Sequence, residues 1–482
     1  MTEPAFQSAT DLIGRLRSRE FGALELLEYF ISRVETFDPR VNAVVVRDFE
    51  GARARARAVD EARARGEDIG PLQGLPMTIK ESFNLTGLPT TFGFPFFRDN
   101  VATSNAVAVD RLLGAGAVVF GKTNVPPGLM DGQSVNDIYG RTNNPWDLGR
   151  TPGGSSGGSA AALAAGLTGL ELGSDIASSI RNPAHYCGVF GHKPTYGVVP
   201  QAGHALAPVL QPVDIAVIGP LARSAHDLEL AFSILAGPAE PDAGAYALTP
   251  PPARITRLTG VRAALVLDDP FAEVDRAVQD RLSDLGDFLA REGAQVSVGA
   301  RPKFDSEELY FLYMILLRAA GSANVSDAEF ALEFEHAKGT TRATRDIARA
   351  NAFGASMSHR DWLRLDEERR RYRTKWIAFF ADFDALLCPP LSTAAFPHTT
   401  TPPQGRTLTV NGREVPFENQ LFWAGYAGAP YLPASVAPIG LTPEGLPVGV
   451  QIIGAPYADL TCLRLAQLLE DHYRAFVPPP GF

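Results

Sequence analysis

Hydrophobic residues near the start of the chain recur at the spacing of an amphipathic helix. Three or four positions separate most successive apolar side chains, namely Leu12, Ile13, Leu16, Leu24, Leu27, Phe30, Ile31 and Val34. Arg and Glu are frequent at the positions between them. This pattern predicts helices over residues 9–64 that pack on a core formed by later parts of the chain.

Beyond Gly70 and Pro71 the pattern changes to short apolar runs separated by Gly and Pro, which favours buried strands. We predict strands at residues 75–80, 115–120, 167–172, 263–267, 385–388 and 447–453. Helical spacing returns between and after them, as at residues 360–380 and 460–472. The alternation predicts an α/β protein.

A glycine-rich loop at residues 153–159 runs directly into an alanine-rich segment. Ser159 is a suitable N-cap and Gly166 a natural stop, so we predict a helix over residues 160–165. A flexible linker shares this composition but is seldom followed at once by a helix. A phosphate-binding loop would need a Lys-Ser or Lys-Thr pair after the glycines, or G-x-G-x-x-G, and neither is present. Residues 153–157 fit the G-x-S-x-G pattern of a hydrolase nucleophile elbow, but the preceding residues are typical of a turn, whereas an elbow requires a strand.

Composition and charge exclude several classes of protein. Of the 482 residues 45% are hydrophobic and 20% charged, as in an ordinary globular chain. The chain has 44 Lys and Arg against 54 Asp and Glu, and its longest basic run, residues 369–371, lies among acidic residues, so no nucleic-acid partner is expected. The widely spaced Cys187, Cys388 and Cys462 indicate neither a disulfide framework nor a structural metal site.

The N-terminal residues lack the basic and apolar segments of a signal peptide. No uncharged apolar run reaches the roughly 18 to 20 residues that a membrane span requires. We therefore expect a cytoplasmic protein that does not associate with membranes.

Two further segments indicate which chemistry the glycine-rich loop serves. Lys80 ends a predicted strand, and a second serine-rich turn occupies residues 173–184. Together with the Gly-Gly-Ser-Ser-Gly-Gly loop, they resemble the amidase signature family of serine hydrolases, whose core carries a strand lysine, this loop and an Asp-x-Gly-Gly-Ser-x-Arg-x-Pro turn. The resemblance extends to residues 121–126, 188–195 and 445–454, and in total covers about residues 74–236 and the chain from Asn419 onward.

The resemblance implies one domain over residues 1–482, an α/β/α sandwich with a large, twisted, mixed central sheet. Residues 1–70 would be N-terminal helices, and residues 71–237 and 402–482 the signature core. Residues 238–401 would be a variable helical elaboration near the entrance of the active site.

By position, the resemblance makes Lys80 the general base, Ser155 the bridging serine and Ser179 the nucleophile, with a cis peptide before Ser155. A serine hydroxyl needs a base, and these segments hold no histidine other than His185 and His192, so a lysine is the expected base. It must be neutral, and lowering its pKa from about 10.4 to about 7 requires roughly 4 to 5 kcal/mol, which burial at a strand end can supply.

For the oxyanion, the resemblance points to the backbone N–H groups of Ile176, Ala177, Ser178 and Ser179. The chain departs from the family pattern here, because Ala177 and Ser178 stand where the pattern has Gly-Gly. We expect a stiffer turn whose side chains narrow the site. Ser178 also becomes a rival nucleophile, although the spacing from Ser155 and the following Ile-Arg fit Ser179 alone.

Other residues near these motifs have two interpretations each. Asp175 and Arg181 are expected to form an ion pair that braces the turn, with substrate contact as the alternative role. Leu129 and Met130 lie where such enzymes line the acyl pocket, and they fit plain core residues equally well. His185, His192 and Cys187 lack partners at ligand or triad spacing and are treated as core or supporting residues, whereas residues 201–204 could touch substrate.

The expected reaction is hydrolysis of a small-molecule carboxamide through an acyl-enzyme, without metal or cofactor; esters and carbamates fit the same chemistry. The alternative is the glutaminase subunit of a tRNA-dependent amidotransferase, which shares this core and works with partner subunits. An inactive binding protein would be expected to have lost Lys80, Ser155 or Ser179, and all three are present. The sequence leaves open whether the chain forms a homodimer.

Overall fold

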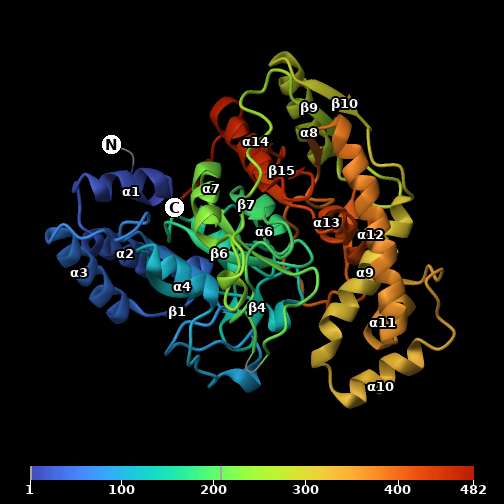
Figure 1. Ribbon diagram of the computed structural model, residues 1–482, viewed down its shortest axis with the longest axis horizontal. Helices are drawn as coiled ribbons and strands as arrows, with labels where there is room; N and C mark the ends of the chain where they lie inside the picture. Colours follow the sequence, from blue (N-terminus) through green and yellow to red (C-terminus); the bar gives the residue numbers. More distant parts are fainter. Residues whose placement is uncertain (1–2, 207–208) are drawn as a thin grey trace.

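The computed structural model describes residues 3–206 and 209–482, and these fold around one eleven-stranded mixed sheet. Figure 1 shows the sheet through the middle of the molecule, with the N-terminal helices on one side and helices of the middle part of the chain on the other. The predicted α/β fold with a large mixed central sheet is confirmed.

The strands follow one another across the sheet in the order β1 (Val44–Arg47), β3 (Val118–Thr123), β2 (Pro76–Lys80), β6 (Glu171–Asp175), β8 (Val217–Ala222), β7 (Phe190–Lys193), β14 (Ala434–Leu441), β15 (Pro447–Ile453), β11 (Ala385–Cys388), β9 (Arg262–Leu265) and β10 (Gln295–Val298). β2 is parallel to β3 and β6, and β9 is parallel to β10 and β11. The other neighbouring pairs are antiparallel. Two small hairpins lie apart from this sheet: β4 (Val135–Asn136) with β5 (Gly140–Arg141), and β12 (Thr407–Val410) with β13 (Arg413–Pro416).

Helices cover both faces of the sheet. Gly191 of β7 lies against Ala184 of α6 (Arg181–Cys187), whereas its neighbour His192 contacts Asp459 of α14 (Asp459–His472). Successive strand residues point to opposite faces, so these two helices lie on opposite sides. α5 (Gly157–Ala164) packs beside α6, and α7 (Ala225–Leu235) packs beside α14.

The remaining helices are α1 (Ala9–Arg17), α2 (Ala23–Val41), α3 (Phe49–Ala64), α4 (Val107–Gly114), α8 (Arg276–Arg291), α9 (Ser306–Gly321), α10 (Asp327–His336), α11 (Ile347–Ser356), α12 (His359–Asp382) and α13 (Leu421–Gly428). Short 3-10 helices occur at Pro4–Phe6, Pro95–Phe97, Pro127–Leu129, Asp242–Gly244, Ser322–Asn324 and Phe417–Gln420.

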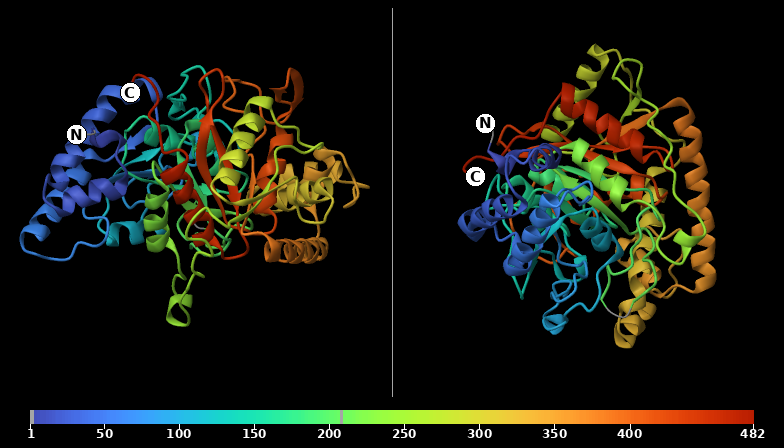
Figure 2. Two further views of the ribbon diagram at one scale, coloured as in Figure 1. Left: turned by 90° about the horizontal axis from the view of Figure 1, so that it is seen from above. Right: turned by 60° about the vertical axis from the view of Figure 1, so that its left-hand side comes forward.

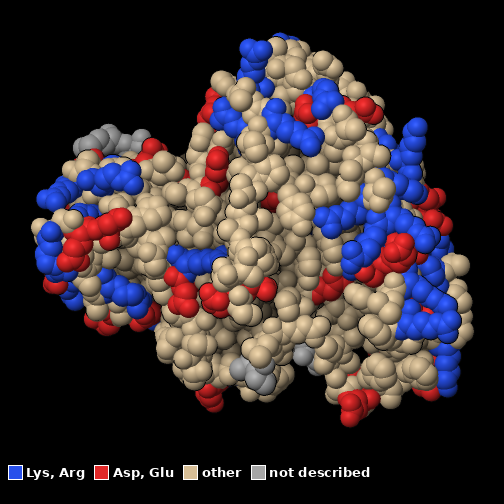
Figure 3. All heavy atoms as spheres, in the orientation of Figure 1, with Lys and Arg blue, Asp and Glu red and all other residues tan. Residues whose placement is uncertain are grey.

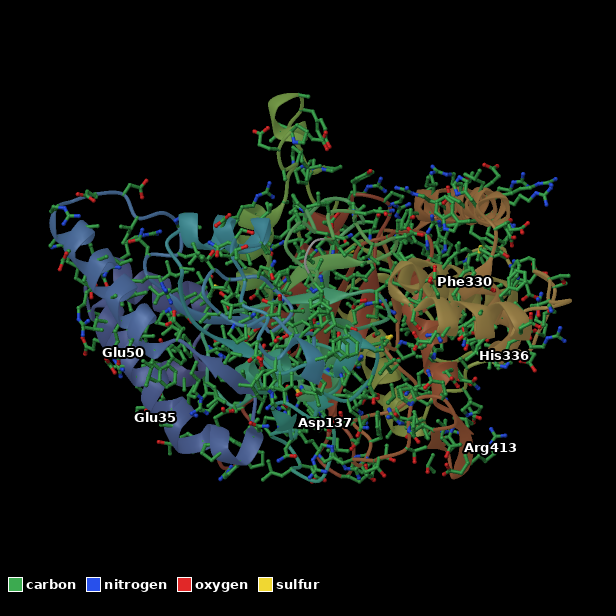
Figure 4. All side chains as sticks on the ribbon, turned by 90° about the horizontal axis from the view of Figure 1, so that it is seen from below. Glu35, Glu50, Asp137, Phe330, His336 and Arg413 are labelled. Carbon is green, nitrogen blue, oxygen red and sulfur yellow. The ribbon has the colours of Figure 1, made fainter. Side chains whose placement is uncertain are left out.

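Residues 238–401 contribute both strands and helices. β9, β10 and β11 extend the central sheet beyond β15, and α8 packs on this part of it. Helices α9 to α12 form a group beside the sheet, and Figure 4 places Phe330 and His336 of α10 on the outer side of this group. Figure 2 shows the segment around Asp242–Gly244 projecting from the body.

The structure corrects several predicted element boundaries. The N-terminal region holds the predicted helices but also β1, whose valines pair with β3 at the sheet edge. The strands predicted at residues 115–120 and 167–172 lie at Val118–Thr123 and Glu171–Asp175. The helix predicted to begin after Ser159 begins at Gly157. Ser159 therefore lies inside the helix and does not cap it, and its hydroxyl bonds Thr123 Oγ1 at 2.9 Å. Tertiary contacts, which a local pattern does not contain, set these boundaries.

On the face seen in Figure 3, Lys and Arg lie among Asp and Glu over the N-terminal helices and over α12, a pattern typical of solvated helix faces. Within residues 3–206 and 209–482, no helix combines the length and apolar composition needed to cross a bilayer.

Candidate active site

The predicted site segments meet at the carboxyl ends of two parallel strands. Lys80 is the last residue of β2, and Asp175 is the last residue of β6. Thr78 of β2 is in register with Glu171 of β6, so the two strands end at the same edge of the sheet. The glycine-rich loop before α5 lies against this edge.

Lys80 is completely buried, and its Nζ donates to Ser155 Oγ at 2.6 Å and to Ser174 Oγ at 2.9 Å. Burial lowers the pKa of Lys80 to about 7, although the charges of Asp175 and Glu171 act to raise it. Near neutral pH this amine can therefore exist without its proton. Ser174 was not predicted as a site residue, and only its place next to Asp175 in the serine-rich turn could have signalled it.

The loop that carries Ser155 is held in one conformation by its neighbours. The Gly154–Ser155 peptide is cis, as the family resemblance implied. A Cβ on Gly154 would lie 2.2 Å from the carbonyl oxygen of Asp131, so only glycine fits. Asn182 Oδ1 accepts from the Gly154 N–H at 3.0 Å, and its amide donates to the Gly154 carbonyl.

The turn that carries Ser179 is organised by a buried ion pair. Asp175 accepts from Arg181 Nη2 at 2.8 Å and Nε at 3.0 Å, and both side chains are fully buried, which confirms the predicted pair. Burial alone would raise the pKa of Asp175, but the charge and hydrogen bonds of Arg181 outweigh it and hold that pKa at about 2. The same carboxylate accepts from the backbone N–H groups of Ser178 and Ile180. One charge pair thus fixes the whole turn.

Ser179 lies between this turn and α6 and is 6% exposed. Its backbone carbonyl accepts from the N–H of Ser156 at 3.1 Å, which joins the two serine-bearing segments. Lys80, Ser155 and Ser179 therefore belong to one connected cluster.

Ser178 adopts φ +79°, in the left-handed region that favours glycine. Its side chain is buried, and within residues 3–206 and 209–482 its Oγ has no hydrogen-bond partner. This is the position at which the family pattern has glycine. The chain therefore carries a hydroxymethyl group at a left-handed position where the pattern has no side chain.

The predicted oxyanion donors are not equivalent. The N–H of Ser178 is occupied by Asp175. In the described part of the chain no hydrogen bond engages the N–H groups of Ile176, Ala177 and Ser179. Tyr313 Oη of α9 donates to the Ile176 carbonyl at 2.9 Å. Because a trans peptide points its C=O and N–H in opposite directions, this bond turns the Ala177 N–H away from α9.

Leu129 and Met130 are not core residues. Leu129 is half-buried with φ +61°, and Met130 is 65% exposed, so the plain-core interpretation is wrong for both. The Met130 methyl group and the ring of Phe94, which belongs to an earlier loop, lie close to Gly128.

The histidines and the cysteine near the motifs are buried among partners of their own. His185 contacts Thr393 O and Gly449 N, and His192 contacts Ser435 Oγ and Asp459 Oδ1. The interpretation of these residues and of the buried Cys187 as core or supporting residues is confirmed.

The segment of residues 201–204 is braced by its own side chains. Gln201 bonds the backbone of Val213 and Ala216, and His204 contacts Ser82 Oγ at 2.9 Å. A role of this segment in substrate contact stays a prediction.

Comparison with known proteins defines the class of this protein. The Amidase family profile matches residues 25–463. The chain is 35% identical to an acylamidase from Rhodococcus erythropolis, over 96% of this chain and 94% of the relative. It is 32% identical to a glutamyl-tRNA(Gln) amidotransferase subunit from Acidothermus cellulolyticus, over 98% and 96% of the two chains.

A solved bacterial aryl acylamidase of the amidase signature family matches the fold with a TM-score of 0.80 at 25% identity, covering 97% of this chain and 96% of that chain. The chain therefore belongs to the amidase family. It is a hydrolase that acts on the carbon–nitrogen bond of amides.

Proposed function

We propose that this enzyme hydrolyses a small-molecule carboxamide through an acyl-enzyme on Ser179, with Lys80 as general base and Ser155 as the proton relay between them. The observation that carries the proposal is the 2.6 Å hydrogen bond from Lys80 Nζ to Ser155 Oγ in a fully buried setting. A neutral amine in this position can accept the proton that a nucleophilic serine must lose.

In the first half of the reaction, Ser179 Oγ attacks the amide carbon while its proton passes to Ser155 Oγ and the Ser155 proton passes to Lys80 Nζ. The tetrahedral intermediate collapses as the carbon–nitrogen bond breaks, and the amine leaves with a proton returned from Lys80 through Ser155. In the second half, water attacks the acyl-enzyme with the same relay as its base, and Ser179 recovers its proton as the carboxylic acid leaves.

The oxyanion would be held by the backbone N–H groups of Ile176, Ala177 and Ser179, which have no other partner among the described residues. Each such donor typically lowers the barrier by about 3 to 4 kcal/mol. Leu129 and Met130 would line the acyl side of the site, and the side chains of Ala177 and Ser178 would restrict its width.

The acylamidase relative and an indoleacetamide hydrolase from Bradyrhizobium diazoefficiens, which is 32% identical over 97% of this chain, favour a carboxamide substrate by their names. Because the acyl-enzyme step is the same, esters and carbamates are further candidates, and pocket shape would decide among them.

The second candidate function is that of an amidotransferase glutaminase subunit, which the 32% identity over 98% of this chain to an amidotransferase relative favours. It predicts that glutamine is hydrolysed and that partner subunits are required. The replacement of Gly-Gly by Ala177 and Ser178 in the turn stands against it.

Intact mass after incubation with a fluorophosphonate probe tests both the class and the nucleophile. We expect the wild type and Ser178→Ala to gain one probe adduct and hydrolyse a chromogenic anilide, and Ser179→Ala to do neither, with a loss of about 10⁴-fold or more in rate. Labelling and turnover by Ser179→Ala would move the nucleophile to Ser178. Glutamine hydrolysis only after addition of partner subunits, with no anilide turnover, would favour the second candidate.

A further inference from the structure

Glu171 is a buried carboxyl group that the proposed reaction does not use. It lies in β6, between β2 and β8 in the sheet, and is 1% exposed. Hydroxyl groups from three elements face it, those of Thr78 in β2, Thr123 in β3 and Ser159 in α5. Within residues 3–206 and 209–482, no Lys, Arg or His nitrogen forms an ion pair with this carboxyl group. A carboxyl group placed among hydroxyls, without a counter-ion, calls for an explanation.

Its place in the sheet puts Glu171 beside the lysine of the site. Thr78 is in register with Glu171 and bonds its carboxyl group. Lys80 is two positions further along β2, so its side chain leaves the same face of the sheet as that of Thr78, about 7 Å along the strand. The Lys80 amine and the Glu171 carboxyl group thus lie in the same buried layer, between α5 and the strands β2, β3 and β6, without direct contact.

Few other charged groups act in this layer. Asp175 also faces Lys80, but its charge is paired with Arg181. His204 lies near Lys80. Burial, and to a smaller extent the charge of Lys80, lowers the pKa of His204 to about 3, so His204 is neutral at neutral pH. α5, which covers the layer, carries no titratable side chain from Gly157 to Ala164. Glu171 is therefore the unpaired acid of the Lys80 environment in the described part of the chain.

We propose that Glu171 is a positioning residue of this enzyme, whose charge sets the protonation state of the Lys80 amine. The proposal rests on the proposed function, in which Lys80 is the general base. When Glu171 carries its proton, the remaining charge that favours the ammonium form is that of Asp175, which is paired with Arg181, and the amine loses its proton more readily. When Glu171 is ionised, it stabilises the ammonium form and opposes the base.

The direction of the pH dependence follows from the two groups. Burial raises the pKa of Glu171 to about 8, and burial lowers the pKa of Lys80 to about 7, so the two groups titrate in the same range as a coupled pair. The Glu171 charge acts to raise the pKa of Lys80. Removal of that charge must therefore move the deprotonation of Lys80 to lower pH.

The test is the pH profile of fluorophosphonate labelling at Ser179, measured from about pH 5 to about pH 10 for the wild type and Glu171→Gln. The amide of glutamine keeps the shape of the side chain and can accept the Thr78 hydroxyl. We expect the midpoint of the acid limb to move to lower pH in Glu171→Gln, by up to about one pH unit, because Glu171 is ionised over only part of the Lys80 titration. Thr78→Val removes the donor that favours the ionised carboxylate, so we expect a smaller shift in the same direction.

Glu81→Gln is the matched control. Glu81 is also completely buried and follows Lys80 directly, but its carboxylate is bound by Thr91 and Phe92 and is not among the charges that act on Lys80. The midpoint of the labelling profile of Glu81→Gln should therefore equal that of the wild type.

Two negative results can be told apart. A lower labelling rate in Glu171→Gln with an unchanged midpoint would assign Glu171 a merely structural role and overturn the inference, while the proposed function stands. A wild type that is not labelled at Ser179 at any pH would overturn the proposed function and this inference with it. If Glu171→Gln does not fold, the midpoint of Thr78→Val decides.

Discussion

Charged side chains are buried at the site between β2 and β6, whereas they are exposed on the solvent-facing sides of the helical group α9 to α12. At the site, Lys80, Glu171, Asp175 and Arg181 are all at most 1% exposed. On α12, the side chains of the Arg371–Glu367 pair are 74% and 59% exposed, and α10 turns Phe330 and Phe334 to solvent. Desolvation makes a charged side chain unfavourable in the first region, whereas an exposed charged side chain in the second region changes the free energy of folding very little.

The difference separates two tasks within one chain. A buried layer can shift the pKa of a lysine and fix the direction of a backbone N–H, because no water competes with its contacts. A solvated helix group cannot do this, but its surface can change with little effect on stability. The two regions meet where Tyr313 of α9 bonds the Ile176 carbonyl of the site turn.

Asp175→Ala should have the largest effect on stability, because it leaves the Arg181 guanidinium buried without its counter-ion. We expect the free energy of unfolding, measured by urea denaturation, to fall by about 3 to 5 kcal/mol. Glu367→Gln, which breaks an exposed pair on α12, should cause no measurable change. Equal stability of the two variants would remove the contrast between the regions.

Lys80→Met should abolish turnover and yet stabilise the fold. Its pKa falls from 10.5 in the unfolded chain to about 7 in the fold, so the unfolded state binds more protons between these values. The cost of burying the ammonium is fully present below about pH 7 and fades as the pH rises to about 10.5. After the lost hydrogen bonds to Ser155 and Ser174 are subtracted, we expect a gain of about 3 kcal/mol at about pH 6.

Denaturation of Lys80→Met and the wild type at about pH 6 and about pH 9 checks this sign, because the advantage of the variant must shrink at the higher pH. An advantage that grows with pH would contradict the assignment of a lowered pKa to Lys80.

Tyr313→Phe tests the contact between the regions. Loss of the hydroxyl frees the Ile176 carbonyl, so the Ala177 N–H is no longer held in one direction. We expect kcat for the anilide to fall about tenfold with KM little changed, because the oxyanion forms only in the transition state. Tyr310→Phe is the control, since it removes a similar bond from α9 to Glu418 O, away from the turn. A rise in KM at constant kcat for Tyr313→Phe would assign that tyrosine to substrate binding.

More of the active site than of the surrounding fold could be predicted from the sequence. The role of Lys80, the serine-rich loop and the cis peptide could be predicted from the resemblance to the amidase signature family, which rests on short motifs. The Asp175–Arg181 pair could be predicted from the residue types within one of these motifs. The edge strand β1 was missed, because three valines between two helices gain a strand partner only from β3. Local patterns do not contain that partner.

The same limit hid several residues around the site. Ser174, Glu171 and Tyr313 acquire their roles from contacts with Lys80, Thr78 and Ile176, which lie far from them in the chain. Ser159 looked like an N-cap because its local sequence fits one, whereas the fold uses its hydroxyl to bond Thr123. Such residues become visible only when the sheet brings distant segments together.

Ser178→Gly should have a small, stabilising effect. At φ +79° serine is strained by about 1 to 2 kcal/mol, and glycine gives back part of this through its greater freedom in the unfolded chain. We expect a net gain of about 0.5 to 1 kcal/mol in the free energy of unfolding. Gly339→Ala, at φ +72° in the helical group, should lose a similar amount. If Ser178→Gly also hydrolyses a wider range of anilides, the strained serine beside the nucleophile serves substrate selectivity. If the variant gains stability but hydrolyses the same anilides, the hydroxymethyl group has no role in selectivity.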